Sequence, residues 1–122
     1  MIVKRSTHPK FLSNAYLLAD EPGGTAVCID AGAPIEPLLA EVEELNVRVS
    51  HVLITHEHHD HTMNMVALEE RFGATVITPD AIADGHEITV GALTLRAVAT
   101  PGHCDPHFSW LVSRGDAPCA LF

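Results

Sequence analysis

The stretch from Thr55 to Thr62, read T-H-E-H-H-D-H-T, constrains this chain more than any other, because it places four histidines and one aspartate within six positions. It directly follows the apolar run Val52-Leu53-Ile54, and the residues after it, from Met63 to Phe72, have the apolar spacing of a helix. A buried strand, a polar loop and then a helix is the arrangement in which α/β sheets place their chemistry, at the carboxyl ends of the strands. The sequence therefore predicts a binding site in this loop.

The side chains of the loop suit a metal ion. In an extended loop alternate side chains point the same way, so His56 and His58 can reach one ion while Glu57 points elsewhere. Asp60 and His61 are adjacent and are expected to point away from that pair, toward a second ion or a bound water. Neutral imidazoles and one carboxylate suit zinc, with iron and manganese as alternatives. The competing interpretation is a histidine-rich surface loop that picks up metal adventitiously.

Length and charge limit the remaining classes of function. With 122 residues, the chain is predicted to form one domain, residues 1–122. Seven basic and sixteen acidic side chains give a formal net charge of −9, which argues against a nucleic-acid partner because phosphate backbones are bound by clustered Lys and Arg.

Three cysteines without a repeated spacing, Cys28, Cys104 and Cys119, indicate a reduced interior and no disulfide framework. The N-terminal residues have no apolar core typical of a signal peptide, and no run approaches the ~18 apolar residues of a membrane span. The expectation is a cytoplasmic protein without a membrane partner.

The order of predicted elements indicates a mixed α+β or α/β fold. Strands and helices alternate in the first half and hairpins follow, which fits a mixed sheet with helices on one face. The expected strands are residues 2–5, 13–19, 25–29, 49–55, 74–78, 87–90, 93–99, 108–113 and 118–122, and the expected helices are 35–45 and 63–72.

Three segments together resemble one known family. His56-x-His58-x-Asp60-His61 resembles the H-x-H-x-D-H signature of the metallo-β-lactamase fold hydrolases. Thr100-Pro101-Gly102-His103 resembles the T-P-G-H element of that family, and Ile29-Asp30-Ala31-Gly32 resembles its I-D-x-G turn. The similarity runs from about residue 11 to the end of the chain and is strongest to the glyoxalase-II-like thioester hydrolases.

The resemblance implies a four-layer αββα sandwich, of which this chain holds roughly the N-terminal half. It implies a first metal site at His56, His58 and His103 and a second at Asp60 and His61. In relatives, a bridging aspartate and a final histidine follow the segment that ends here at Phe122. The expectation is therefore a sheet face left open, in a chain that is a fragment, self-associates or pairs with a separate C-terminal half.

The implied activity is hydrolysis of a small-molecule thioester or ester by metal-activated hydroxide, with one or two zinc ions and Asp60 orienting the nucleophile and accepting its proton. Two alternatives stay open. One is a mononuclear-iron persulfide dioxygenase, and the other is a metal-binding but inactive fragment.

Several other residues receive lesser roles. Asp30 is expected to stay off the metal and to hydrogen-bond the loop backbone. His107 is expected to line the pocket or the surface, with substitution for a lost metal ligand as the weaker alternative. Glu57 and His59 are the weakest ligand candidates in the loop, and Cys104 is a weak one beside His103. The remaining expectations are surface positions for His8, His51 and His86, and core positions for Tyr16 and Trp110.

Overall fold

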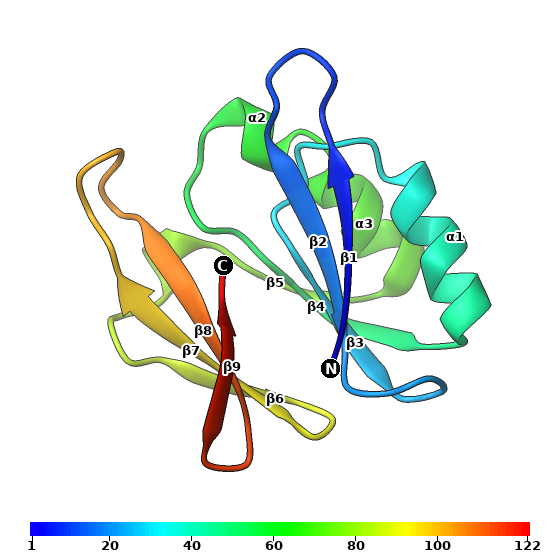
Figure 1. The fold of residues 1–122 in the computed structure, drawn as a ribbon. Coiled ribbons are helices and arrows are strands. Elements are labelled where there is room, and N and C mark those ends of the chain that lie inside the picture. Colours follow the sequence, from blue (N-terminus) through cyan, green and yellow to red (C-terminus); the bar gives the residue numbers. More distant parts are fainter.

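The computed structural model describes residues 1–122 as two β-sheets that pack against each other, with the helices on the outer side of the first sheet (Figure 1). The first sheet contains β1 to β5 in sequence order, and the second contains β6 to β9 in sequence order. None of the helices has the length and apolar character needed to cross a membrane.

The first sheet is mixed, as the sequence predicted. Neighbouring strands β1, β2 and β3 are antiparallel, whereas β3, β4 and β5 are parallel and are connected through helices. Its strands are β1 (Ile2–Thr7), β2 (Asn14–Ala19), β3 (Thr25–Ile29), β4 (Arg48–Leu53) and β5 (Thr75–Ile77). The carboxyl ends of the parallel strands β3 and β4 therefore lie at one edge, where Asp30 and the histidine loop emerge.

The helices start and stop where the sequence provides local signals. Helix α1 (Glu36–Leu45) has Pro37 in its first turn and ends at Asn46, and α3 (Met65–Phe72) ends at Gly73. Both terminating residues are in the left-handed region, with φ values of 52° and 60°, which suits Asn and Gly. Two short elements complete the set, α2 (His59–Thr62) and the 3₁₀ helix η1 (Pro79–Ala81).

The second sheet is an antiparallel meander. Its strands are β6 (Glu87–Val90), β7 (Leu93–Ala99), β8 (Phe108–Arg114) and β9 (Ala117–Leu121). Alternate residues of β7 and β8 are buried, so one face of this sheet points inward and the other outward.

Two apolar cores hold these layers together. The first lies between the helices and the first sheet, and it includes Leu38 of α1 and Leu68 of α3. The second lies between the two sheets, where Leu18, Val27 and Ile29 of the first sheet share a cluster with Trp110 of β8. Trp110 is fully buried, which confirms its predicted place in the core.

The expectation of an open sheet face is wrong for the first sheet. The face opposite the helices is covered by β6 to β9 of the same chain, and the side chains of this second core are buried. The C-terminal hairpins form this second sheet and do not extend the first layer. A strand pattern reveals which residues alternate, but it does not show that the hairpins form a separate sheet that folds back over the first.

The predicted helix 63–72 is shorter in the structure and is preceded by another helix. The structure has two helices in this region, and α2 begins at His59, inside the histidine loop. The loop is therefore extended only as far as His58, which has β-type dihedral angles, and it then turns helically through Asp60 and His61.

Asp20, at the end of β2, connects the two sheets. Its buried carboxylate accepts hydrogen bonds from the backbone N–H groups of Glu21 and Thr25 in its own hairpin and of Ala92 in the β6–β7 turn. Arg114 of β8 donates to the Asp20 backbone carbonyl at 3.1 Å. This residue therefore fixes the position of the second sheet relative to the first.

Candidate metal centre

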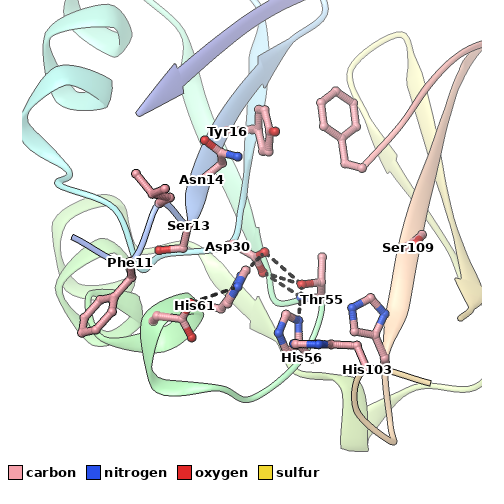
Figure 2. Close-up of a pocket in the computed structure, with 14 residues that line it drawn as sticks. Phe11, Ser13, Asn14, Tyr16, Asp30, Thr55, His56, His61, His103 and Ser109 are labelled. Atoms are coloured by element: carbon pink, nitrogen blue, oxygen red, sulfur yellow. Dashed lines mark hydrogen bonds and ion pairs between the residues drawn. The ribbon is translucent and has the colours of Figure 1, made fainter. Parts of the chain in front are cut away.

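The candidate site lies where the β4 segment of the first sheet meets the start of β8 in the second (Figure 2). The backbone N–H of Phe108 donates to the carbonyl of Thr55 at 2.9 Å, which joins the two segments directly. The loop between β7 and β8 carries His103 back over the histidine loop, although the two lie more than forty positions apart in the sequence.

Three of the predicted ligands converge. The nearest ligand atoms of His56, His58 and His103 all lie within 4.8 Å of one another. Their ring centroids are 4.7 Å apart for His56 and His58, 5.0 Å for His56 and His103, and 4.9 Å for His58 and His103. Glu57 and His59, the weak candidates, are exposed and stand outside this group.

His56 has the environment of a ligand. It is 3% exposed, and its Nδ1 lies 2.9 Å from the hydroxyl of Thr55, whereas its Nε2 is buried without any hydrogen-bond partner. A buried polar atom with no partner is costly unless something else binds it. Burial, with help from the neighbouring His61 and His107, lowers the pKa of His56 to about 4, so this imidazole is neutral at pH 7. Neutral imidazole is the form that binds metal, and the residues therefore fit a metal ion.

Asp60 and His61 lie beside this group. The rings of His61 and His56 are 4.1 Å apart between centroids, and Nε2 of His61 lies 3.5 Å from the carboxylate of Asp60. Both side chains are partly exposed, 19% for His61 and 33% for Asp60. The structure therefore brings all five predicted residues into one region.

Asp30 holds the two ends of the histidine loop. Its carboxylate accepts the backbone N–H of Thr55 at 2.8 Å and lies 2.7 Å from Nδ1 of His61 (Figure 2). This hydrogen bond raises the pKa of His61, against the opposing effect of burial. The prediction that Asp30 hydrogen-bonds the loop backbone is confirmed, and its contact with His61 adds a role that the sequence did not indicate.

The backbone beside Asp30 supports the same loop. A Cβ atom on Gly32 would lie 1.4 Å from the carbonyl oxygen of Asp60, so only glycine fits there. The N–H of Ala31 donates to the carbonyl of His61 at 2.8 Å, and the N–H of Asn64 donates to the carbonyl of Ala31 at 2.9 Å. The I-D-x-G turn therefore packs closely against the backbone that carries the ligands and hydrogen-bonds to it.

The site opens into a cavity of about 430 Å³, within the usual range for small-molecule pockets. Its polar wall includes His56, Asp60, His61 and His103. Its opposite wall was not found from the sequence, and it comes from the β1–β2 segment and the end of the chain: Phe11, Leu12, Ser13, Asn14, Tyr16 and Phe122.

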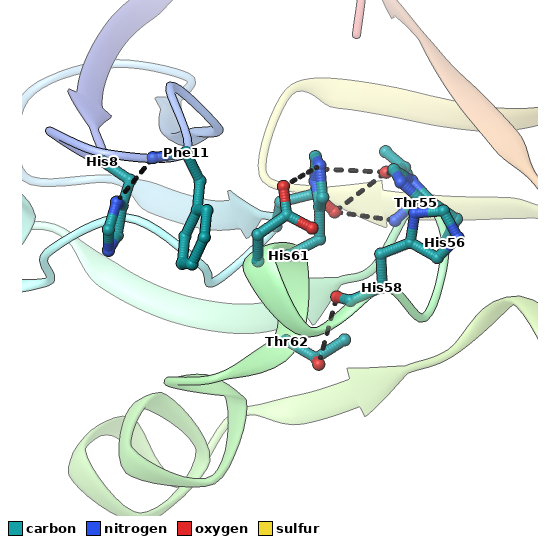
Figure 3. A network of polar contacts seen from close by, with 9 residues as sticks. His8, Phe11, Thr55, His56, His58, His61 and Thr62 are labelled. Atoms are coloured by element: carbon teal, nitrogen blue, oxygen red, sulfur yellow. Dashed lines mark hydrogen bonds and ion pairs between the residues drawn. The ribbon is translucent and has the colours of Figure 1, made fainter. Parts of the chain in front are cut away.

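Tyr16 and His8 make contacts that the sequence did not predict. Tyr16 is half-buried and packs against the core between the sheets, in line with its predicted position, but it also lines the cavity and makes an edge contact with Phe122 at 5.0 Å between ring centroids. His8 is half-buried, its Nδ1 accepts the N–H groups of Lys10 and Phe11 at 3.1 Å each, and its ring stacks on Phe11 (Figure 3). The sequence predicted the His8-Pro9 turn, but it did not predict that Phe11, shortly after this turn, lines the cavity.

The remaining candidates from the sequence are His107, His86, His51 and Cys104. His107 lines the cavity, as one of the two predicted options, and His86 is exposed as predicted. His51 is half-buried on β4, with Nδ1 2.8 Å from the hydroxyl of Ser50, so it is less exposed than predicted. Cys104 is a free thiol that stands outside the histidine group.

The sequence of the chain matches the model of one protein family. The sequence model of the metallo-beta-lactamase superfamily matches residues 8–87, which is more than half of the chain. The chain belongs to the metallo-beta-lactamase superfamily. Superfamily members bind metal ions, in agreement with the three converging histidines.

Two curated proteins are similar to most of this chain. The chain is 34% identical over 118 residues to a hydroxyacylglutathione hydrolase of Bradyrhizobium sp. (strain BTAi1), covering 88% of this chain and 45% of that protein. It is 34% identical over 116 residues to the thioesterase pkgB of Emericella nidulans, covering 86% of this chain and 34% of that protein.

Among solved structures, ETHE1 from Myxococcus xanthus superposes with a TM-score of 0.78 at 33% identity, covering 92% of this chain and 54% of that one. The chain thus spans less than half the length of these two curated relatives and about half of the solved one.

Proposed function

We propose that this protein is a metal-dependent hydrolase of a small-molecule thioester or ester. The observation that carries this proposal is the convergence of His56, His58 and His103, with the buried Nε2 of His56 lacking any protein partner. Relatives named hydroxyacylglutathione hydrolase and thioesterase support the choice of a thioester.

In this proposal, His56, His58 and His103 hold the first ion, the open three-histidine set of a catalytic zinc site. Asp60 and His61 supply two ligands for a second ion, whose shell is completed by water or by residues of another segment or chain. Zinc is the proposed metal, with iron and manganese as alternatives. A homo-oligomer or a C-terminal half that provides the missing ligands stays part of the proposal.

A bound metal would polarise the substrate carbonyl and lower the pKa of water from 15.7 to about 7. Asp60 is one-third exposed at the cavity, so its carboxylate can accept a hydrogen bond from the attacking water and then its proton. Asp30 accepts a hydrogen bond from Nδ1 of His61, which leaves the lone pair of His61 Nε2 for the site next to Asp60.

The opposite wall of the cavity suits the organic part of the substrate. Phe11, Leu12, Tyr16 and Phe122 give it apolar surface, and Phe11 and Leu12 are 50% and 69% exposed, so they are accessible to a ligand. An acyl group bound along this wall would lie with its carbonyl toward the histidines.

A mononuclear-iron persulfide dioxygenase is the second candidate. It is favoured by the observation that only three histidines gather within ligand distance of one another, whereas Asp60 and His61 provide two donors for any second ion. One iron per chain with oxygen uptake on glutathione persulfide would support this alternative over the hydrolase.

The decisive experiment measures metal content and hydrolysis together. The protein is purified without added metal, its metals are quantified, and release of thiol from a hydroxyacyl thioester of glutathione is followed with a thiol reagent. Turnover that depends on zinc and is lost in His56→Ala, but not in His59→Ala, supports the proposal. A zinc-loaded protein that releases no thiol from this or simpler thioesters overturns it and leaves the metal-binding but inactive fragment.

A further inference from the structure

His107 is held firmly at the edge of the candidate site by its backbone. Its carbonyl accepts the N–H of Thr100 at 2.9 Å, which closes the loop that carries His103. The next residue, Phe108, donates its N–H to Thr55 at 2.9 Å. His107 is therefore attached on one side to the His103 loop and on the other to the His56 segment.

The imidazole of His107 is also oriented. Its Nδ1 lies 2.9 Å from the hydroxyl of Thr100, and that hydroxyl lies 3.0 Å from the hydroxyl of Ser109. Its ring stacks on the ring of His56, 4.6 Å away between centroids and inclined by 28°. The Nε2 atom of His107 makes no hydrogen bond to the protein, and the residue lines the cavity.

His107 is not a member of the converging group. The ligand atoms within 4.8 Å of one another belong to His56, His58 and His103 alone, and the ring of His107 is 6.2 Å from that of His103. The His107 imidazole is therefore oriented at the cavity without belonging to the ligand group. Its free ring nitrogen is available to hydrogen-bond a substrate that enters this cavity.

We propose that His107 binds the carbonyl oxygen of the substrate by donating a hydrogen bond from Nε2–H. The inference rests on the proposed function and names a substrate-binding residue for it. The proposal requires the tautomer in which Thr100 donates to Nδ1 of His107 and Ser109 donates to Thr100, because this leaves the imidazole proton on Nε2; the 2.9 Å and 3.0 Å contacts accommodate that arrangement. The carboxylate oxygen of the product is held in the same way.

The geometry gives this hydrogen bond a role in catalysis. The ring of His107 stacks on the ring of His56, whose buried Nε2 has no protein partner, so a substrate oxygen held at the candidate metal centre would share the cavity with the N–H of His107. A hydrogen bond to an oxygen that gains negative charge strengthens as the charge develops. Thr100 acts on His107 and not on the substrate, and it is a positioning residue.

Acetate is the probe for the test, because it presents the carboxylate of a product without requiring turnover. The protein is loaded with cobalt(II), and acetate binding is followed by the visible absorption of the metal while metal stoichiometry is measured in parallel. His107→Ala is expected to keep its metal and to bind acetate roughly tenfold or more weakly, the effect of losing one hydrogen bond to a charged group.

Two pairs of variants separate the hydrogen bond from a packing effect. His107→Gln can place an amide N–H near the position of Nε2 and is expected to regain part of the acetate affinity, whereas His107→Asn is too short and is not. Thr100→Val, which removes the orienting hydroxyl, is expected to weaken acetate binding, and Thr100→Ser is expected to preserve it.

The outcomes distinguish this inference from the proposed function. Acetate affinity in His107→Ala equal to that of the wild type overturns the inference, and so does loss of the metal, which would make His107 a ligand. Thioester hydrolysis by the wild type is measured separately. If hydrolysis is absent while acetate binding still depends on His107, the proposed function fails and the role of His107 in binding a carboxyl oxygen stands.

Discussion

The carboxylate of Asp30 lies 2.7 Å from Nδ1 of His61 and accepts the backbone N–H of Thr55 at 2.8 Å, so one buried side chain holds both ends of the histidine loop. Asp30 is 5% exposed and has a positive φ of 60°, which directs it toward the loop from the end of β3. The parallel pairing of β3 with β4 places these segments side by side. Asp30 therefore links the sheet topology to the arrangement of the ligands.

Replacing Asp30 by Asn should weaken metal binding without removing a ligand. The amide keeps the shape of the side chain, but it loses the negative charge and one of the acceptor oxygens that serve His61 and Thr55. Loss of such a supporting contact typically costs about 10- to 100-fold in metal affinity. Competition with a chromophoric chelator measures the effect. Glu57→Gln is the matched control in the same loop, and equal affinities for the two variants would contradict this role of Asp30.

Replacing Gly32 by Ala should displace the loop itself. The new Cβ would lie 1.4 Å from the carbonyl oxygen of Asp60, so the backbone of Asp60 and His61 has to move. We expect a lower free energy of unfolding and a large loss of metal affinity, measured by urea titration and by chelator competition.

The control for this variant is Gly73→Ala, at a helix end where a Cβ meets nothing within 4 Å. Its φ of 60° makes it costly to stability by about 1 kcal/mol, but it should leave the metal affinity unchanged. If both variants keep full metal affinity, the close packing of Gly32 against Asp60 does not position the ligands.

Replacing Asp20 by Asn should destabilise the contact between the two sheets. The carboxylate serves three backbone N–H groups, and the amide can accept at one oxygen only, so a buried N–H of Thr25 or Ala92 is left without a partner. The expected cost is about 1–3 kcal/mol in the free energy of unfolding at pH 7, measured with urea. Asp116→Asn, in the exposed β8–β9 turn, is the control.

The effect of Asp20 should also depend on pH. Burial raises the pKa of Asp20, but the hydrogen bonds from Thr25, Ala92 and Glu21 outweigh it, so the folded pKa lies below the ordinary value of 3.8. A carboxyl group with a lowered folded pKa stabilises the protein above its unfolded pKa and loses that contribution as the pH falls through the folded pKa. The difference between wild type and Asp20→Asn should be constant from pH 7 to 5 and shrink below about pH 4. A difference that grows on acidification would contradict the assignment.

Local patterns predicted most of the elements. The strands at 25–29, 87–90 and 93–99 have the predicted bounds, and Gly73 ends α3 as expected, because alternation and helix-stop signals are encoded in neighbouring residues. The strand at 49–55 is shorter in the structure, Arg48–Leu53, because Ile54 and Thr55 already belong to the loop.

Long-range relationships were harder to predict. The packing of Val27 and Ile29 against Trp110 joins segments that are some eighty positions apart, and strand alternation does not identify the partner sheet. In the site, the motif predicted the histidines because its spacing is local. Phe11 and Tyr16 were missed as cavity residues, because their place depends on how β1 and β2 lie beside the histidine loop.

Metal stoichiometry in a histidine series tests the central claim most directly. The wild type and the variants His56→Ala, His58→Ala, His103→Ala and His59→Ala are purified without added metal, loaded with zinc, freed of excess and analysed for metal and protein. The three converging histidines predict that each of the first three variants loses tightly bound zinc, while His59→Ala, in the same loop but outside the group, retains it. Full zinc retention in His103→Ala, or loss of zinc in His59→Ala equal to that in His56→Ala, would contradict the account.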